Sequence, residues 1–277
     1  MRAIPVVNLS MLHHGEEPPI SGTRGSGAVF FEGCSLKCIF CQNYDISRGA
    51  TVAGHIYNAE ELSVLYLELQ SEGAHNINLV TGSHFIPTIA ESIMLAKDKG
   101  LNVPVIFNCG GYERVESLKM LDGLIDIYLP DMKFFSSSLS RELCSAPDYF
   151  KVCRDALEEM YRQTGPFELD GEGIMKRGMI VRHLMLPGQL FDTKKVLDHL
   201  SGTYGDNIYI SLMNQYTPFE YKYPSMRLPD YLTRKLPQGH YDAAADYLLN
   251  LGRTNVFIQE EDASGDELLP DFRSAES

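Results

Sequence analysis

The sequence predicts an α/β fold, with a mainly parallel sheet whose strands are joined by helices. Two observations lead to this prediction. Short runs rich in Val, Ile, Phe and Tyr alternate with segments whose apolar residues recur at helical spacing, a pattern typical of repeated βα units. The 277-residue chain also carries no low-complexity linker between these units. Because α/β barrels of this length form one unit, we expect a single domain.

Six runs are expected to form the strands of this sheet. Each is short and apolar, and they cover residues 28–31, 77–80, 103–107, 125–129, 178–186 and 208–212. Proline donates no backbone hydrogen bond, so Pro104 is expected at the start of the third strand. Parallel strands joined by helices are covered on both faces or closed into a barrel, with the active site at their C-terminal ends.

Helices are expected between these strands. Asn58 and Glu61 form a capping-box pattern at the start of the first helix, and Gly73 closes it. Pro87 suits the first turn of a second helix that ends before Gly100. The other helical patterns cover 115–121, 152–160, a helix capped by Asp192 that continues to 200, and 241–251.

The two ends of the chain are expected to form extensions of the core domain. Residues 1–27 precede the first strand and form an N-terminal extension, whereas 28–252 form the core domain. Residues 253–277 are expected to form a last strand and an acidic tail. From residue 260 onward this tail has seven acidic residues against one arginine, a composition typical of disorder.

Composition excludes several classes of function. The formal net charge of −13 disfavours nonspecific binding to nucleic acids or anionic membranes. No apolar run approaches the roughly 18 residues of a membrane span, and the first residues are too short and interrupted for a secretory signal. We therefore expect a cytoplasmic protein whose thiols stay reduced.

Three cysteines directly after the first expected strand give the strongest chemical signal. Cys34, Cys38 and Cys41 have C-x-x-x-C-x-x-C spacing. Three close thiolates each bind one iron of a cubane cluster and leave the fourth iron open to a small chelating molecule. A zinc site with a distant fourth ligand is the alternative, but zinc sites more often pair two C-x-x-C motifs. The remaining cysteines are isolated: Cys109, Cys144 and Cys153.

With Phe40 at the aromatic position, this motif resembles the signature of the radical S-adenosylmethionine (SAM) superfamily, C-x-x-x-C-x-aromatic-C. The resemblance runs from about Ala28 to Thr217 and is greatest to the activating-enzyme branch related to pyruvate formate-lyase activase. Residues 16–18, 21–27 and 41–44 are similar to an activase-like subgroup of that branch. The resemblance implies a partial (β/α)6 barrel that holds a [4Fe–4S] cluster on the three cysteines and SAM on the open iron.

The same resemblance implies a reaction and partners. One electron from a flavodoxin or ferredoxin would cleave SAM reductively to a 5′-deoxyadenosyl radical. The radical would then abstract hydrogen from a substrate, which in the activating enzymes is a glycyl residue of a partner enzyme. Two alternatives stay open: radical modification of a small molecule or peptide, and a non-catalytic iron–sulfur or zinc protein. Too few cysteines remain for an auxiliary cluster.

Polar residues after the second, third and fourth strands are further candidates for binding the cofactor. Ser83 and His84 stand where the superfamily usually has an acid that holds the methionyl ammonium, and this acid is missing here. Asn108, Asp131 and Lys133 match positions that contact the ribose or carboxylate of the cofactor in the resembled activases. The alternatives are a strand-ending turn for the first two residues and a surface ion pair for Asp131 and Lys133.

Two further candidates for binding the cofactor lie later in the sequence. Arg182 lies inside the fifth strand, where an unpaired charge is costly, so we expect it to point into the barrel toward an anion such as the carboxylate of the cofactor. His183 should face the opposite way by alternation and serve packing. Gln215 follows the sixth strand, where related enzymes have polar residues near the adenine. The glycine-rich 21–27 segment lacks a phosphate-loop ending and is assigned to backbone packing.

Overall fold

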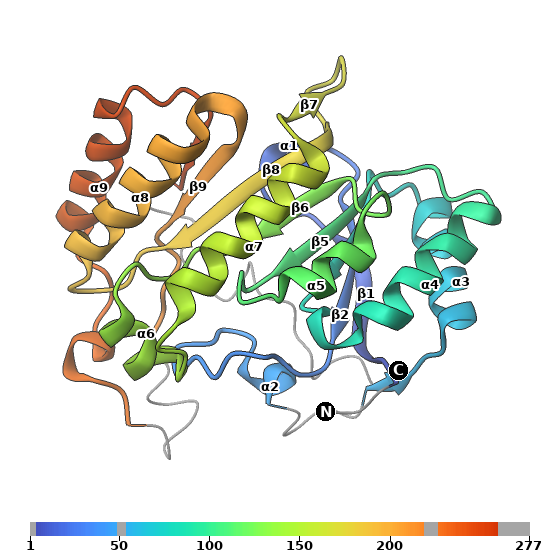
Figure 1. The fold of residues 1–277 in the computed structure, drawn as a ribbon, viewed down its shortest axis with the longest axis horizontal. Coiled ribbons are helices and arrows are strands. Elements are labelled where there is room, and N and C mark those ends of the chain that lie inside the picture. Colours follow the sequence, from blue (N-terminus) through green and yellow to red (C-terminus); the bar gives the residue numbers. More distant parts are fainter. Residues whose placement is uncertain (1–3, 49–53, 219–226, 260–277) are drawn as a thin grey trace.

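The strands of the computed structural model form one open sheet (Figure 1). The structure describes residues 4–48, 54–218 and 227–259. The strands are β1 (Val6–His13), β2 (Ser26–Phe31), β3 (His55–Ile56), β4 (Ile77–Val80), β5 (Val105–Cys109), β6 (Ile127–Pro130), β7 (Glu168–Leu169), β8 (Met175–Leu184), β9 (Tyr209–Met213) and β10 (Val256–Ile258). Their order is β10-β9-β8-β6-β5-β4-β2-β1-β3, with β7 paired to β8 outside this path.

The core of the sheet is parallel. Strands β2, β4, β5, β6, β8, β9 and β10 pair in parallel in this order, whereas β1 lies antiparallel to β2. Among the described residues, the two edge strands β3 and β10 do not pair with each other, so the barrel stays open. This confirms the predicted partial α/β barrel. All six predicted strands are present, and the third begins just after Pro104, as expected.

The helices cover the outside of the sheet (Figure 1). The predicted ones are α3 (Ala59–Ser71), α4 (Ile86–Asp98), α5 (Val115–Leu118), α7 (Tyr149–Thr164), α8 (Leu190–Tyr204) and α9 (Gln238–Asn250). The structure adds three shorter helices: α1 (Pro18–Ser21), α2 (Tyr44–Ser47) and α6 (Ser137–Cys144). The capping box of α3 is confirmed, because the Asn58 side chain accepts from the Glu61 backbone and the Glu61 side chain accepts from the Asn58 backbone.

The predicted role of Asp192 as the cap of its helix is wrong. Helix α8 begins at Leu190, so Asp192 lies within its first turn. The buried carboxylate accepts hydrogen bonds from the backbone of Phe135 at 3.0 Å and of Ser136 at 2.8 Å. Asp192 therefore holds the loop before α6, a tertiary contact that the local pattern does not reveal.

The segment between β1 and β2 closes the barrel at the N-terminal ends of the parallel strands. Ile20 in α1 is fully buried in an apolar cluster with Ile106 of β5, Ile127 of β6 and Ile180 of β8. Its carbonyl accepts a 2.7 Å hydrogen bond from the Asn76 side chain. We call residues 14–22 the plug, because they seal the inside of the barrel below the site.

Shortening the apolar side chain of the plug is expected to lower stability slightly. Ile20→Val removes one buried methyl group and should reduce the free energy of unfolding by about 0.5–1.5 kcal/mol. Denaturant unfolding monitored by circular dichroism measures this change. Ile56→Val is the matched control, because Ile56 is 63% exposed and its stability effect should be undetectable. Equal loss in both variants would contradict the packing role of the plug.

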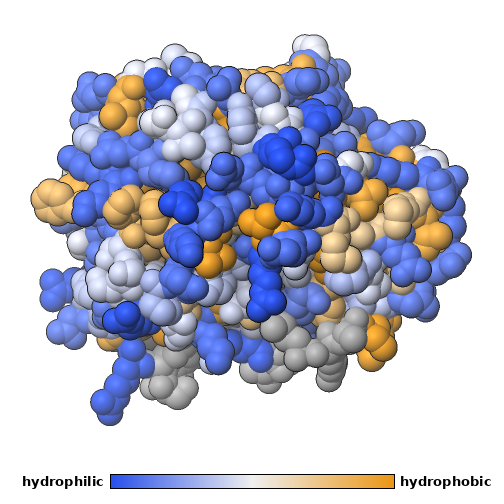
Figure 2. All heavy atoms as spheres, in the orientation of Figure 1, coloured by the Kyte–Doolittle hydropathy of each residue, from blue (hydrophilic) through white to orange (hydrophobic). Residues whose placement is uncertain are grey.

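The surface carries no membrane-spanning element among the described helices, since none of them is long and apolar enough to cross a bilayer. Figure 2 shows a face that is largely hydrophilic, with scattered apolar side chains.

Candidate functional site

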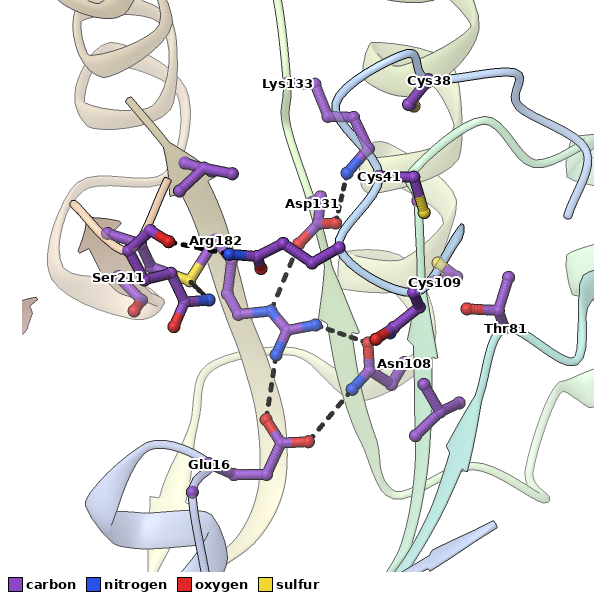
Figure 3. Close-up of a pocket in the computed structure, with 18 of the residues that line it drawn as sticks. Glu16, Cys38, Cys41, Thr81, Asn108, Cys109, Asp131, Lys133, Arg182 and Ser211 are labelled. Atoms are coloured by element: carbon purple, nitrogen blue, oxygen red, sulfur yellow. Dashed lines mark hydrogen bonds and ion pairs between the residues drawn. The ribbon is translucent and has the colours of Figure 1, made fainter. Parts of the chain in front are cut away.

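A cavity of about 580 Å³ lies inside the barrel, toward the C-terminal ends of the parallel strands (Figure 3). Residues from β2, β4, β5, β8, β9 and β10 line it, together with the plug and the segment that follows β6. Nine of the residues predicted from the sequence take part in this lining: Cys34, Cys38, Phe40, Cys41, Asn108, Asp131, Lys133, Arg182 and Gln215. The fold thus gathers side chains that are up to 181 positions apart in the sequence.

The three motif cysteines lie on the loop that follows β2. The loop is fixed against the C-terminal end of α6, because the Ile39 amide donates to the Leu143 carbonyl at 2.9 Å. The Cys38 sulfur faces the sulfur of Cys144 at 3.1 Å. Phe40 packs edge-on against Phe134, with ring centroids 5.9 Å apart. The loop therefore holds its thiols against a buried apolar support.

Burial sets the electrostatics of these thiols. It raises the pKa of Cys34 to about 12, and the neighbouring thiols add to the shift. The pKa of Cys41 is raised for the same reasons, whereas that of Cys38 is raised first by its contact with Cys144. Lys133 opposes the shift at all three sites. Three thiolates at this place therefore need additional positive charge, which bound metal supplies.

The donor set fits an iron–sulfur cluster. Three thiols on one loop line one cavity, and thiolates are the usual ligands of cubane clusters. Each thiolate would bind a different iron of the cluster. In the part of the chain that the structure describes, no three cysteine, histidine or carboxylate side chains are grouped around a position for a single metal ion.

A second group of side chains forms a polar network, which consists of Glu16, Asn108, Asp131, Lys133 and Arg182. The Arg182 guanidinium lies at its centre (Figure 3) and donates to Asp131 at 3.2 Å, Glu16 at 2.9 Å and Asn108 at 2.5 Å. Lys133 donates to the other oxygen of Asp131 at 2.6 Å. Figure 3 shows Lys133 on the side of the cysteines and Glu16 on the opposite side of Arg182.

The network explains how charges persist inside the barrel. Burial disfavours the charged form of Asp131, but Lys133 and Arg182 together hold its pKa below the usual range. Arg182 points into the barrel, as the sequence predicts. Its partners there are carboxylates and an amide of the chain itself, so the expected contact with the carboxylate of a cofactor stays a prediction.

Ser83 and His84 do not line the cavity. The Ser83 hydroxyl donates to the Glu113 carboxylate at 2.7 Å, and a ring nitrogen of His84 lies 2.7 Å from the Glu32 carbonyl oxygen. Thr81, which has a left-handed backbone with φ of 61°, lines the cavity in their place. The expected cofactor contacts of Ser83 and His84 stay a prediction.

Glu113 is a buried acid that the sequence analysis missed. It is 4% exposed, lies behind Ser83 and Cys109, and has its pKa raised by burial to about 7. Cys109 itself lines the cavity. The local sequence around Glu113 gives no signal of this role, because its partner Ser83 belongs to another βα unit.

Glu113 is expected to make the folded state less stable as pH rises. Its folded pKa is raised, so the folded state retains a proton that the unfolded state loses. This stability is present below the unfolded pKa and is lost as pH rises to about 7, by about 3 kcal/mol at most. We expect the free energy of unfolding to depend less steeply on pH in Glu113→Gln than in the wild type, between the unfolded pKa of a glutamate and pH 7. Identical slopes in the two proteins would contradict the raised pKa of Glu113.

The remaining predicted residues take clear positions. Gln215 lines the cavity, and its carbonyl accepts from the Gln42 side chain at 2.7 Å, which links the cysteine loop to the end of β9. His183 faces away from the cavity and contacts the Met132 carbonyl and the Thr193 hydroxyl, so its packing role is confirmed.

The plug supplies residues that the sequence analysis did not assign to the site. Glu16 and Glu17 both line the cavity, next to Ser211 of β9. Glu16 contacts Arg182 across 166 positions of sequence, and no local pattern predicts a pair at this separation.

Comparison with known proteins identifies relatives of the fold. No protein-family model matches the chain. A protein of Methanocaldococcus jannaschii that is described as uncharacterised is 30% identical over 245 residues, which are 85% of this chain and 64% of that protein. The chain therefore spans somewhat less than two thirds of this relative.

Solved structures share the architecture at low sequence identity. SuiB of Streptococcus suis bound to S-adenosylmethionine has a TM-score of 0.54 at 12% identity, over 83% of this chain and 49% of SuiB. HydG, a maturase of the [FeFe]-hydrogenase, has a TM-score of 0.54 at 16% identity, over 86% of this chain and 52% of HydG. A spore photoproduct lyase variant has a TM-score of 0.53 at 11% identity, over 83% of this chain and 74% of the lyase. This chain therefore shares the open α/β barrel fold of these three structures.

Proposed function

We propose that this chain is a radical SAM enzyme that holds a [4Fe–4S] cluster on Cys34, Cys38 and Cys41. It cleaves SAM reductively to a 5′-deoxyadenosyl radical, which abstracts hydrogen from a substrate. One observation carries the proposal: three thiols on a single loop line an interior cavity that also contains a charged polar network. The shared fold supports it, since SuiB with this fold is bound to S-adenosylmethionine.

Cys34, Cys38 and Cys41 would hold the cluster, which when bound would supply the one electron needed to break a carbon–sulfur bond of the sulfonium of SAM. The chain positions and protects the reactants. Lys133 offsets negative charge at the cysteine loop, and Asp131 fixes the Lys133 ammonium there. Asn108 and Asp131 offer polar atoms to the ribose or carboxylate of SAM, and Gln215 offers them near the adenine. The buried Phe40 ring helps to keep water, and the hydrogen-atom donors dissolved in it, away from the radical. Such donors would quench the radical.

The electron donor and the substrate follow from the resemblance. A flavodoxin or ferredoxin would reduce the cluster. Hydrogen abstraction from a glycyl residue of a partner enzyme is the first candidate for the reaction. Radical modification of a small molecule or peptide is the second.

Product analysis tests the proposal. The protein is reconstituted with iron and sulfide without oxygen, reduced with dithionite and incubated with SAM. We expect 5′-deoxyadenosine and methionine in equal amounts. A glycyl-radical enzyme added as substrate should show a glycyl radical in its electron paramagnetic resonance (EPR) spectrum if the first candidate holds. A reconstituted protein that binds iron but forms neither product would be a non-catalytic iron–sulfur protein.

A further inference from the structure

Cys38 has a neighbouring cysteine that the proposed cluster does not use. Its sulfur lies 3.1 Å from the sulfur of Cys144, the last residue of α6. Both residues are free thiols in the structure. Cys38 lines the cavity and is 8% exposed, whereas Cys144 is 1% exposed and lies behind it, outside the cavity lining. The pair therefore joins one proposed cluster ligand to a thiol without an assigned role.

The backbone fixes the two sulfurs beside each other. The residues on both sides of Cys38 donate hydrogen bonds to the end of α6. The Lys37 amide donates to the Cys144 carbonyl at 3.3 Å, and the Ile39 amide donates to the Leu143 carbonyl at 2.9 Å. The sulfurs of a disulfide lie about 2.0 Å apart, so these two need to approach by about 1 Å. Because the two backbones are already side by side, rotation of the side chains supplies this movement.

We propose that Cys38 and Cys144 form a reversible disulfide when the cluster is absent, and that this bond controls whether the cluster can be bound. A cysteine in a disulfide has no thiolate to offer to iron, so only two ligands of the proposed three remain. The inference goes beyond the proposed reaction, because it concerns the protein before the cluster is loaded. It rests on the assignment of Cys38 as a cluster ligand.

Hydrogen peroxide is the oxidant that we assign to this step, because it is small enough to reach Cys38 through the cavity. It converts the Cys38 thiol to a sulfenic acid and releases one water. The Cys144 thiol then attacks the sulfenic sulfur, and a second water leaves as the disulfide forms. The two thiols together lose two electrons and two protons, which reduce the peroxide to water. Contact with Cys144 and burial raise the pKa of Cys38, so the first step is slow.

The second thiol also makes the oxidation reversible. A sulfenic acid that meets no thiol is oxidised further to a sulfinic acid, which ordinary thiol reductants do not reverse. Cys144 lies close enough to Cys38 to react first. A dithiol reductant then takes the disulfide back to two thiols, and the cluster ligand is recovered.

Peptide mapping of the iron-free full chain tests the inference. The protein is treated with hydrogen peroxide, its free thiols are alkylated under denaturing conditions, and the digest is analysed by mass spectrometry without reduction. Trypsin cuts after Lys37 and chymotrypsin after Phe40, which separates Cys38 from the other two motif cysteines. We expect a linked pair of peptides that contain Cys38 and Cys144. Iron uptake by the oxidised protein should fall about tenfold or more and return after treatment with dithiothreitol.

Cys144→Ala and Cys153→Ala are the paired variants. Reduced Cys144→Ala should take up as much iron as the wild type, because Cys144 is not a ligand. After peroxide it should give no linked peptide, its Cys38 should carry a sulfinic acid, and dithiothreitol should not restore iron uptake. Cys153→Ala removes another buried thiol outside the cavity lining and should behave as the wild type in every measurement.

Three results would overturn the inference: no linked peptide in the wild type, a link from Cys38 to a cysteine other than Cys144, or unchanged iron uptake by the linked protein. The mapping uses the wild type, so the result does not depend on the folding of a variant. It also requires neither cluster nor SAM. A linked protein that, once reduced and reconstituted, forms no 5′-deoxyadenosine refutes the proposed reaction alone, whereas a protein that forms this product but no link refutes the disulfide alone.

Discussion

Replacing Cys38 with Ala is expected to abolish the cluster and SAM cleavage together. Cys38 is the middle ligand of the proposed three, and it lies buried on the cysteine loop. With two thiolates left, a second iron of the cubane loses its protein ligand and the cluster dissociates. Reconstituted Cys38→Ala should therefore lose the broad visible absorption and the iron of the wild type, and 5′-deoxyadenosine should fall to background.

Cys153→Ala is the matched control for this experiment. Cys153 is also buried, but it does not line the cavity, and its sulfur faces the backbone carbonyl of Asp131 at 3.7 Å. We expect its iron content and product formation to match those of the wild type. SAM cleavage that persists in Cys38→Ala would contradict the ligand assignment. Loss of iron in both variants would indicate a general effect of removing a buried thiol.

Replacing Arg182 with Met is expected to destabilise the protein strongly. Arg182 is the partner of Glu16, Asp131 and Asn108, and its side chain is 15% exposed. Its removal leaves Glu16 without a cation and Asp131 with Lys133 alone. Breaking a buried ion pair from one side costs about 3–5 kcal/mol. Urea unfolding of the apoprotein, monitored by circular dichroism, measures the loss independently of any cofactor.

Two further variants separate this effect from a general loss of surface charge. Arg154 forms an exposed pair with its neighbour Asp155, so Arg154→Met should leave the unfolding midpoint unchanged. Arg182→Met leaves the Glu16 carboxylate without its cation. Adding Glu16→Gln removes this unpaired charge and should recover part of the stability. An additive loss in the double variant would show that Glu16 and Arg182 are not coupled.

The sequence predicts the parallel core because that core depends on local pattern. Runs such as 77–80 and 208–212 are apolar enough to be buried on both faces, and α3 carries a capping box that its sequence shows. The plug is different. Ile20 follows two prolines and belongs to a helix of four residues, so no periodicity marks it. Its burial arises from contacts with β5, β6 and β8, which only the folded sheet brings together.

The residues of the site also fall into two groups, those that a local sequence pattern predicts and those that depend on tertiary contacts. The spacing of the cysteines fixes their place on one loop, and the ends of β5 and β6 bring Asn108 and Asp131 to the cavity, as expected. The turn after β4 is less predictable, because the left-handed backbone of Thr81 precedes a short helix that directs Ser83 toward Glu113. Glu17 could not be predicted either, since its position depends on the plug.

Iron, sulfide and EPR analysis of the oxygen-free reconstituted protein tests the central claim most directly. Three protein thiolates leave one iron of a cubane open to an external ligand. We predict about four irons and four sulfides per chain, as in a [4Fe–4S] cluster, and an EPR signal of the reduced protein that changes when SAM is added. A preparation that holds zinc without iron, or a cluster whose signal is unaffected by saturating SAM, would contradict the account.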